Sequence, residues 1–320
     1  MAVTPSPVVT DLRSLASGVA RAVAIGNFDG VHRGHAALIR ATVAAARNAS
    51  LEACVLTFSP HPARLLAPDR APPLLMPEAR KIELLLALGV DRVLVQPFDW
   101  ALAALSPHAF AHDLLRDRID ARVVSVGYDF SFGAKRAGTV TTLGELGREM
   151  GFVAHIAPAV RVRGVVCASS AIRALITAGR VDEAEALLGR PAELEGQVVH
   201  GAQRGRTIGF PTINVAYQNE VAPASGVYVG EVQLADGRVH RAAINVGTNP
   251  TFTEAGAPVR VEAHLLGYSG DLYGQHVRLG FWQRLRDEKK FGGIDALVAQ
   301  IRADLAQAES HLRPELPPTD

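Results

Sequence analysis

The feature that most constrains this fold is the glycine-rich stretch from Gly26 to His35, which lies between two segments of different character. Before it comes an apolar run, residues 19–25, that is typical of a strand, and after it an alanine-rich run, residues 35–48, that favours a helix. The sequence therefore predicts a strand-to-helix turn. Such a turn exposes helix N-terminal amides, which bind anions at the edge of an α/β sheet.

Two histidines lie in this turn, His32 and His35, three residues apart around Gly34. At that spacing two side chains can share one face of the first helical turn. Gly34 lacks a side chain, so a ligand can approach the backbone closely. The bare pattern His-x-Gly-His also occurs by chance, and its place between a strand and a helix is what makes it meaningful. We expect an anion to bind here.

The segment from about residue 19 to residue 188 alternates between short apolar runs and helix-favouring runs. We expect strands at residues 51–58, 91–98, 122–127 and 152–156, and helices at residues 77–88, 106–119, 141–150, 169–178 and 181–188. This alternation predicts a Rossmann-like α/β domain with a parallel sheet covered by helices on both faces. Ligands of such sheets bind beyond the carboxyl ends of the strands, where His61 and residues 129–135 would lie.

After Gly189 the pattern changes to a strand-rich, glycine-rich sequence. Strands are expected at residues 226–232, 238–246, 259–266 and 275–282. Asp236-Gly237, between the first two, is typical of a hairpin turn. This part predicts an antiparallel β-barrel or sandwich, followed by an amphipathic helix over residues 294–312. We therefore expect two domains, residues 1–188 and residues 189–320.

Length and charge limit the function classes. The chain of 320 residues is long enough for two domains, and its formal net charge of +1 gives no field for binding nucleic acid or an anionic membrane. No uncharged apolar run is long enough to span a bilayer, and the first residues lack a signal-peptide layout. Cys54 and Cys167 lie far apart in apolar runs, which indicates buried thiols in a reducing compartment. We expect a cytoplasmic protein with small-molecule substrates, no nucleic-acid or membrane partner, and homo-oligomerisation left open.

A second polar motif, residues 167–173, lies near the end of the first expected domain. Ser169 and Ser170 place hydroxyls at the start of an expected helix, and Arg173 places a cation one turn later. Hydroxyls, amides and a cation arranged in this way can bind a phosphate. The alternative is a serine-capped helix with a surface arginine.

The two motifs together resemble the nucleotidyltransferase superfamily, which is marked by His-x-Gly-His and a distal Ser-Ser/Thr-x-Ile-Arg. The longer match, which adds residues 57–62 and 126–133, resembles the FMN adenylyltransferase module of bacterial FAD synthetases. Two positions depart from that family, because Ala168 stands where Ser is frequent and Ser170 where Thr is common.

This resemblance implies adenylyl transfer, in which a phosphate of FMN attacks the α-phosphorus of ATP and pyrophosphate leaves. His32, His35 and Arg173 would stabilise the charge that develops. The residues implied to bind ATP are Gly26, Asn27, Phe28, Gly34, Ser169 and Ser170. Those implied on the flavin side are Phe58, His61, Pro62, Asp129 and Phe132, of which Phe58 could equally belong to the core.

A second glycine-rich stretch, residues 196–214, ends in Pro-Thr-Ile-Asn. Its glycines permit a tight loop over an anion, but the Gly-Lys-Ser/Thr of a Walker loop is absent. A glycine-rich hairpin of a barrel is the alternative. The run resembles the riboflavin kinase domain, whose motif reads Pro-Thr-Ala-Asn, with Ile213 here in place of Ala. Further matches lie at residues 245–252, 261–264, 271–274 and 284–291, and the two resemblances cover roughly residues 19–311.

The kinase resemblance implies that Thr212 and Asn214 ligate Mg²⁺, which prefers oxygen donors. Glu262 would be the general base that takes the proton from the ribityl 5′-hydroxyl. Arg286 would lie in the segment that closes over the flavin. The residues implied to bind ATP in this domain are Gly201, Gly205, Arg206, Thr207 and Gly209.

We therefore expect a bifunctional enzyme that phosphorylates riboflavin to FMN and adenylylates FMN to FAD, with ATP as co-substrate and Mg²⁺. One alternative is a monofunctional nucleotidyltransferase for another phosphorylated substrate, against which Thr212, Asn214 and Glu262 argue. The other is a non-catalytic flavin-binding regulator, against which the retained His32 and His35 argue.

Two groups of charged residues are expected to lie on solvated surfaces. His108 and His112 have the i, i+4 spacing of metal ligands, but no third ligand follows in α-helical register. Four basic side chains receive no role either: Arg64, Arg70, Arg80 and Lys81.

Overall fold

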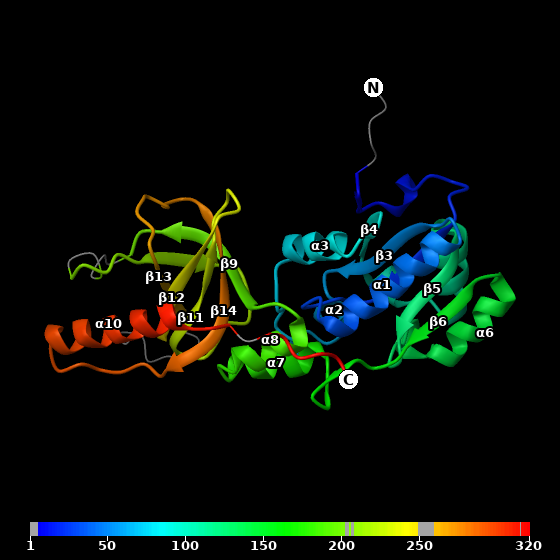
Figure 1. Cartoon of the computed structure of the whole chain (residues 1–320). Coiled ribbons are helices and arrows are strands. Elements are labelled where there is room, and N and C mark those ends of the chain that lie inside the picture. Colours follow the sequence, from blue (N-terminus) through cyan, green and yellow to red (C-terminus); the bar gives the residue numbers. More distant parts are fainter. Residues whose placement is uncertain (1–5, 202–204, 206–207, 249–258, 314) are drawn as a thin grey trace, which may run out of the picture. The chain divides into compact units, whose positions relative to one another are not determined.

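Two compact units make up the chain, each with its own hydrophobic core, and each is described by itself (Figure 1). The computed structural model describes residues 6–201, 205, 208–248, 259–313 and 315–320. The first unit comprises residues 1–73 and 78–161, and the second comprises residues 74–77 and 162–320.

The first unit is built on a six-stranded parallel sheet, as expected. Its strands are β1 (Val8–Val9), β2 (Arg21–Ile25), β3 (Glu52–Ser59), β4 (Arg92–Pro97), β5 (Ala121–Gly127) and β6 (Val153–Ala157). Their spatial order is β1-β4-β3-β2-β5-β6, and every neighbouring pair is parallel. The chain runs from β2 through β3 to β4 and then crosses to the other side of β2 for β5. This reversal places the turn after β2 at the crevice where such sheets bind ligands.

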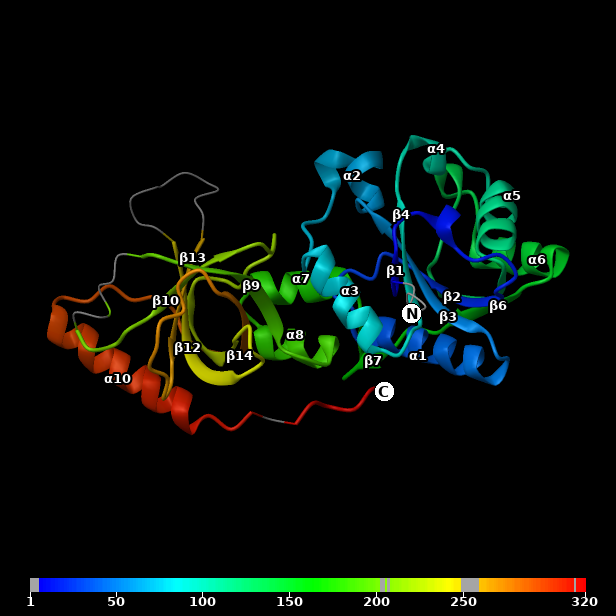
Figure 2. The ribbon, with the colours of Figure 1, turned by 90° about the horizontal axis from the view of Figure 1, so that it is seen from above.

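Helices cover both faces of this sheet, with α1 on one side and α5 and α6 on the other (Figure 2). The helices are α1 (Arg33–Asn48), α2 (Pro62–Leu66), α3 (Glu78–Ala87), α4 (Trp100–Ala103), α5 (Pro107–Ala109), the π-helix η3 (Phe110–Arg118) and α6 (Val140–Met150), with 3₁₀ turns η1 (Leu12–Ser14), η2 (Pro68–Arg70) and η4 (Ala134–Arg136). Side chains of β2 alternate between the faces: Val23 and Ile25 join the core beneath η3 and α6, whereas Ala22 packs against Ala46 of α1.

The expected helix over residues 106–119 begins as predicted but then widens. Ser106 caps it, because the Ala109 N–H donates to Ser106 Oγ at 3.1 Å. The following π-helical turns bring His112 Nδ1 within 2.8 Å of Asp113 Oδ1 and 3.5 Å of Asp117 Oδ2. The face is solvent-exposed, as expected. The π-helical repeat places Asp117 beside His112, a neighbour that an α-helical repeat does not provide.

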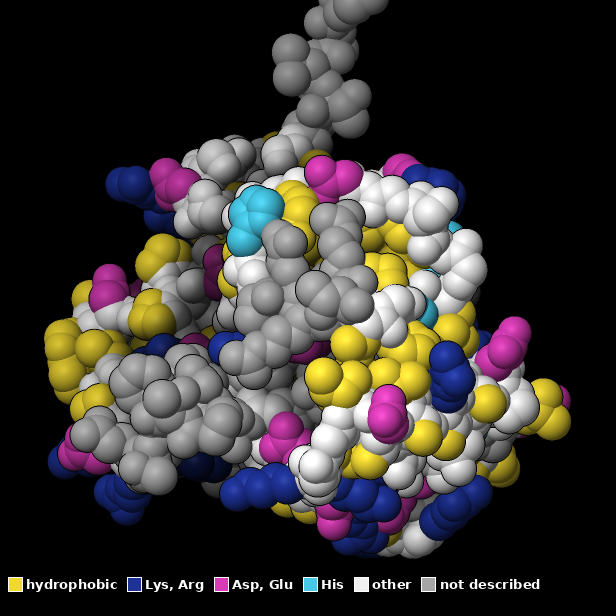
Figure 3. Space-filling view, turned by 90° about the vertical axis from the view of Figure 1, so that its left-hand side faces the viewer, with side chains coloured by type: hydrophobic (Ala, Val, Ile, Leu, Met, Phe, Trp, Pro, Cys, Tyr) yellow, Lys and Arg dark blue, Asp and Glu magenta, His cyan; other side chains and the backbone are white. Residues whose placement is uncertain are grey.

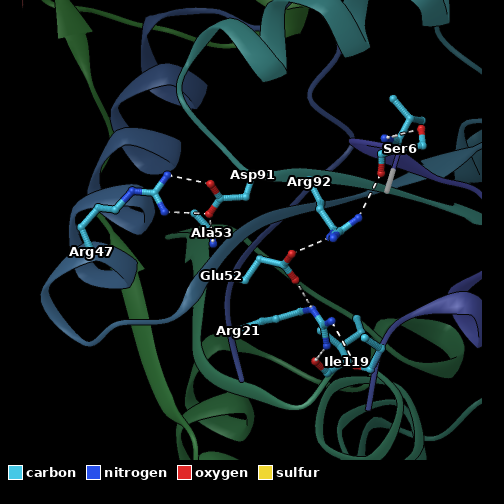
Figure 4. A network of polar contacts seen from close by, with 10 residues as sticks. Ser6, Arg21, Arg47, Glu52, Ala53, Asp91, Arg92 and Ile119 are labelled. Carbon is cyan, nitrogen blue, oxygen red and sulfur yellow. Dashed lines mark hydrogen bonds and ion pairs between the residues drawn. The ribbon is translucent and has the colours of Figure 1, made fainter. Parts of the chain in front are cut away.

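The amino-terminal ends of the first unit's strands are held by ion pairs (Figure 4). Glu52 accepts hydrogen bonds from Arg21 and Arg92, and Arg21 is only 1% exposed. Arg47 of α1 donates to Asp91 at 2.7 Å and 2.8 Å, and this pairing lowers the pKa of the Asp91 carboxyl. The buried guanidinium of Arg21 needs a partner such as Glu52, because an unpaired charge is costly to bury. The network lies at the sheet edge opposite the turn after β2, so it stabilises the strands without using groups of the candidate site.

The second unit contains a closed antiparallel barrel, which decides between the expected barrel and sandwich. Its strands are β9 (Ala192–Val199), β10 (Ile213–Tyr217), β11 (Gly226–Gln233), β12 (Val239–Thr248), β13 (Val259–Leu265) and β14 (His276–Arg286), in the order β10-β13-β12-β11-β14-β9. The hairpin at Asp236-Gly237 is confirmed, since the Leu234 N–H donates to Arg238 O at 2.8 Å across the turn.

In the part of the second unit that the structure describes, helices and a small hairpin accompany the barrel. They are β7 (Arg161–Val162), β8 (Val165–Val166), α7 (Ser169–Thr177), α8 (Val181–Leu188) and α10 (Ile294–Ser310). The expected C-terminal helix is α10, which covers the outer face of the barrel where Ala308 packs with Val229 and Trp282.

The packing boundary falls upstream of the expected domain boundary between residues 188 and 189. Val181 of α8 packs into the barrel core, and α7 packs on α8, so both helices belong to the second unit. Cys54 and Cys167 are buried and form no disulfide, and burial raises the pKa of the Cys54 thiol to about 12. Among the described residues, no helix is long and apolar enough to cross a membrane.

Candidate active sites

The turn after β2 has an unusual backbone that its sequence explains. Phe28, Gly30 and Val31 all have positive φ, of 52°, 86° and 38°. A Cβ on Gly26 would lie 3.0 Å from the Phe28 ring, so a glycine is needed where that ring folds back. Phe28 is only 1% exposed. Its side chain therefore shapes the loop, and any contact with ATP falls to its backbone.

The two histidines of the turn form one compact group at the start of α1. His32 is the N-cap residue, and its Nδ1 accepts a hydrogen bond from the His35 N–H at 3.3 Å. The two rings stack with centroids 3.5 Å apart, and the Phe28 ring meets His35 edge-on at 5.2 Å. Because Nδ1 of His32 is the acceptor, its proton is assigned to Nε2. His32 can thus donate from Nε2 to an anionic oxygen beside the helix amides.

A lysine reaches this turn from α3. The Lys81 Nζ donates to Thr57 Oγ1 at 3.3 Å, and Thr57 Oγ1 donates to Asn27 O in the turn at 3.2 Å. Burial lowers the pKa of Lys81, and the charges of Glu78 and Asp29 oppose that shift. The expectation that Lys81 is solvated was wrong, because this side of α3 packs over the strand ends.

Arg80 departs from the same expectation. Its side chain is 10% exposed and pairs with Glu83 at 2.7 Å. The sequence alone did not distinguish Lys81 and Arg80, which make specific contacts, from lysines and arginines on the solvated surface.

The β3–α2 connection carries the first group of residues expected on the flavin side. His61 is the N-cap of α2, and its Nδ1 accepts from the Ala63 N–H at 3.2 Å, with Pro62 as the first helical residue. Phe58 is partly buried against the core and meets Phe98 edge-on at 5.8 Å. These residues lie at the carboxyl end of β3, the expected edge of the sheet.

The loop after β5 carries the second group of residues expected on the flavin side. Asp129 is exposed at the loop, as expected. Phe132 is only 6% exposed and packs on Phe110 at 5.4 Å, so its ring is part of the core, and its expected role at the flavin stays a prediction. Tyr128, 50% exposed, is the aromatic side chain that the loop offers to solvent. Tyr128 could have been considered from the sequence, because it directly precedes Asp129 in the matched stretch 126–133.

The distal motif forms the start of α7. Ala168 occupies the N-cap position and gives no side-chain cap, while Ser169 and Ser170 are the first two helical residues. Backbone amides and hydroxyls at this end, with Arg173 one turn on, suit an anion. By packing, α7 belongs to the second unit, and the expected approach of Arg173 to His32 stays a prediction.

The barrel presents a row of polar side chains on adjacent strands. Asn214 of β10 pairs with Glu262 of β13, which pairs in turn with Asn245 of β12. Residues opposed across antiparallel strands share one face of the sheet. The alternate residues Val215 and Val261 lie in the barrel core, so the polar row faces outward. Asn245 was not among the expected site residues, although it opens one of the matched stretches.

One of the described glycines before β10, Gly201, lies directly against this row. A Cβ on Gly201 would come within 2.2 Å of Asn214 Nδ2 and 2.6 Å of its Oδ1. A Cβ on Gly205 would lie 2.4 Å from Phe210 O and 3.5 Å from Thr212 Oγ1. Gly209 has a φ of 87°, which favours glycine. Arg206 and Thr207, two of the expected ATP ligands, lie outside the described residues.

Because Gly201 and Gly205 have no side chains, the oxygens of Thr212 and Asn214 are not crowded by them. The Glu262 carboxylate lies on the neighbouring strand β13. Neutral oxygens beside a carboxylate are the donors that Mg²⁺ accepts, so the residues present fit the ion.

Two residues near this row differ from expectation. His264 ends the matched stretch 261–264 but was not among the expected site residues; its ring nitrogen Nδ1 lies 2.7 Å from Pro211 O and holds the segment that leads to Thr212. Arg286 was expected at the flavin, but its guanidinium pairs with buried Asp304 at 2.6 Å and donates to Asp287 O at 2.8 Å. It joins β14 to α10, and its expected role at the flavin stays a prediction.

Comparison with known proteins identifies both halves of the chain. Residues 16–171 match the FAD synthetase family, and residues 188–312 match the riboflavin kinase family. A curated relative from Escherichia coli K12, named bifunctional riboflavin kinase/FMN adenylyltransferase, is 40% identical over 280 residues, covering 88% of this chain and 89% of the relative. The chain belongs to this bifunctional family. The expected bifunctional transferase of FAD biosynthesis is thereby confirmed.

Two further matches at lower sequence identity also cover most of the chain. The Bacillus subtilis relative of the same name is 34% identical over 291 residues, with 89% of this chain and 90% of the relative covered. A solved structure from Streptococcus pneumoniae, titled a macrolide-efflux protein, superposes with a TM-score of 0.85 at 31% identity and covers 95% of this chain and 99% of its own. The family architecture therefore extends over nearly the whole chain.

Proposed function

We propose that the turn after β2 catalyses adenylyl transfer from ATP to FMN, within a functional domain of residues 1–188, and that the polar row of the barrel phosphorylates riboflavin, within residues 189–320. Riboflavin, FMN and ATP follow from the family as substrates, and FMN and FAD as products. The observation that carries the proposal is the contrast between the two sites. One gathers hydrogen-bond donors at a helix N-terminus, and the other gathers oxygen acceptors around a carboxylate.

In the barrel, Glu262 takes the proton of the riboflavin 5′-hydroxyl as that oxygen attacks the γ-phosphorus of ATP, and ADP leaves. Glu262 fits this role because it is opposite Asn214 in the strand register and its side chain is 27% exposed. Thr212 and Asn214 would hold Mg²⁺, which supplies positive charge to the phosphates. The glycines at 201, 205 and 209, with Arg206 and Thr207, would contact the phosphates of ATP.

In the first unit, an FMN phosphate oxygen attacks the α-phosphorus of ATP, and pyrophosphate leaves. The attacking group is already an anion, so no general base is needed, and positioning with charge stabilisation is sufficient. His32 donates from Nε2, and beside it lie His35, Gly34 and the amides of α1, and Asn27 of the preceding loop. Ser169, Ser170 and Arg173 would bind the leaving pyrophosphate, and Phe58, His61, Pro62 and Asp129 would flank the flavin.

The partners proposed are small molecules, and the proposed location is the cytoplasm. The net charge of +1 supports this choice over a nucleic-acid partner. Figure 3 shows acidic and basic side chains interspersed on the face that it presents. Homo-oligomerisation stays open in this proposal.

One assay tests both halves: the purified full chain with riboflavin, ATP and Mg²⁺, sampled over time and resolved by chromatography. FMN should appear first and FAD later. Chelation of the metal should stop FMN formation, and added Mg²⁺ should restore it. Folded protein that leaves riboflavin unreacted would refute the proposal for the barrel, and FMN that accumulates without FAD would refute it for the turn.

A further inference from the structure

Lys81 is a half-buried lysine that the roles assigned so far do not use. It lies in the first turn of α3, and its ammonium donates to the buried Thr57 hydroxyl at 3.3 Å. Removing an ammonium from water is costly unless an anion compensates it. Among the residues that the structure describes, Lys81 makes no ion pair within 4.0 Å. The Lys81 ammonium therefore has the neutral Thr57 hydroxyl as its hydrogen-bond partner.

The position of this ammonium relates it to the turn after β2. Thr57 lies near the carboxyl end of β3, the strand beside β2, and its Oγ1 also donates to Asn27 O at 3.2 Å. Lys81 is thus one hydroxyl away from the loop that precedes His32. The pKa of Lys81 is lowered by burial, against the opposing effect of Glu78 and Asp29. An arriving polyanion would relieve the burial cost and favour the charged form.

We propose that Lys81 is a phosphate-binding residue of the adenylyl-transfer site, whose ammonium contacts the triphosphate of ATP. This inference rests on the proposed function of the turn after β2. Thr57 orients the Lys81 ammonium and also donates a hydrogen bond to Asn27 O in the loop. Through Thr57, a phosphate bound by Lys81 would therefore be connected to the position of this loop. The reading that competes with it is a purely structural tie between α3 and the loop.

Steady-state kinetics of FMN adenylylation tests the proposal in the full chain. Lys81→Met keeps the aliphatic stem and removes the charge, and should raise KM for ATP by about 10- to 100-fold, the loss expected for one charge-assisted hydrogen bond. KM for FMN should change by less than about threefold. Lys81→Arg should recover most of the ATP affinity. Arg40→Met, which removes an exposed charge from α1 of the same unit, is the matched control and should behave as wild type.

Thermal melting followed by circular dichroism reports on folding of each variant, because the barrel has a core of its own and its kinase activity would not reveal unfolding of the first unit. A Lys81→Met protein with unchanged KM for ATP would overturn the proposal. So would a Lys81→Arg protein as impaired as Lys81→Met, because a charge contact tolerates arginine and a tightly packed structural tie does not.

A measurement on the wild-type protein covers the case in which Lys81→Met fails to fold. Acetylation of lysines by an amine-reactive ester is followed by peptide mass spectrometry, and the rate at Lys81 is compared with and without ligand. ATP or inorganic pyrophosphate should slow acetylation of Lys81, and adenosine should not. Equal rates with and without ATP would reject the contact. This readout needs no FAD formation, so it separates failure of this inference from failure of the proposed activity.

Discussion

The two candidate sites hold the same co-substrate in our proposal but are built from opposite groups. At the turn after β2, amides, two imidazoles and a lysine supply donors and positive charge. On the barrel, Thr212, Asn214 and Glu262 supply oxygen atoms. The difference follows from the acceptors, because the phosphate of FMN attacks as an anion whereas the hydroxyl of riboflavin must first lose a proton.

The sites also differ in how the fold holds them. The turn depends on local backbone geometry, with three positive φ values and a histidine cap within a few residues. The barrel row depends on strand register, because Asn214, Glu262 and Asn245 meet only when three strands are correctly paired. Substitutions should therefore separate the two activities cleanly, and the next predictions test that separation.

The largest effect is expected for Glu262→Gln, which keeps the shape of the side chain but cannot accept the proton. Riboflavin phosphorylation should fall by about 10²- to 10⁴-fold, the usual contribution of a general base. FMN adenylylation by the same protein should stay at the wild-type rate. Both rates are measured separately, with riboflavin or FMN as the starting flavin. A Glu262→Gln protein with an unchanged kinase rate would remove Glu262 as the base.

His32→Asn should have the next largest effect, on the other activity. Asparagine is a good N-cap residue, so the start of α1 is preserved while the imidazole is lost. Conversion of FMN to FAD should fall by about 10²- to 10³-fold, as for loss of one donor to transition-state charge. Riboflavin phosphorylation should not change.

His32→Ala is the companion variant, because it also removes the cap at a cost of about 1 kcal/mol in stability. If Asn and Ala lower the adenylylation rate equally while Ala alone lowers the melting temperature, capping and catalysis are separate functions of His32. An Asn variant with full activity would show that His32 acts only as a cap.

Sequence patterns were sufficient to predict the architecture, because the features that determine it are local. Apolar periodicity, Ser106 as a cap and Asp236-Gly237 as a turn each act within a few residues, and each is found as expected. The π-helical widening after Ala109 was not foreseeable from an α-helical repeat, and it moved Asp117 next to His112. Packing of α7 and α8 with the barrel likewise depends on tertiary contacts.

For the sites, sequence gave the residue types but not the environment of each side chain. Phe132 and Phe28 carry aromatic rings that could have bound substrate, yet both are buried. Arg286 is held by Asp304, 18 residues further along the chain, a partner that no local motif indicates. Lys81 and His264 show the converse, since their positions depend on which neighbours the fold brings to them.

The smallest effect is expected for Gly201→Ala, which tests how closely the glycine loop must approach the barrel row. The backbone at Gly201 is acceptable for alanine, because its φ is not positive, so only the added Cβ matters. That Cβ would meet the Asn214 amide at 2.2 Å and displace a flexible side-chain end. The kinase KM for Mg²⁺-ATP should rise about tenfold, equivalent to roughly 1.4 kcal/mol, with adenylylation unchanged. Gly144→Ala on α6, where a Cβ meets nothing within 4 Å, is the control and should leave both activities intact. A normal kinase KM in Gly201→Ala would mean that Asn214 tolerates displacement, and the barrel site would then rest on Thr212 and Glu262 for its oxygen donors.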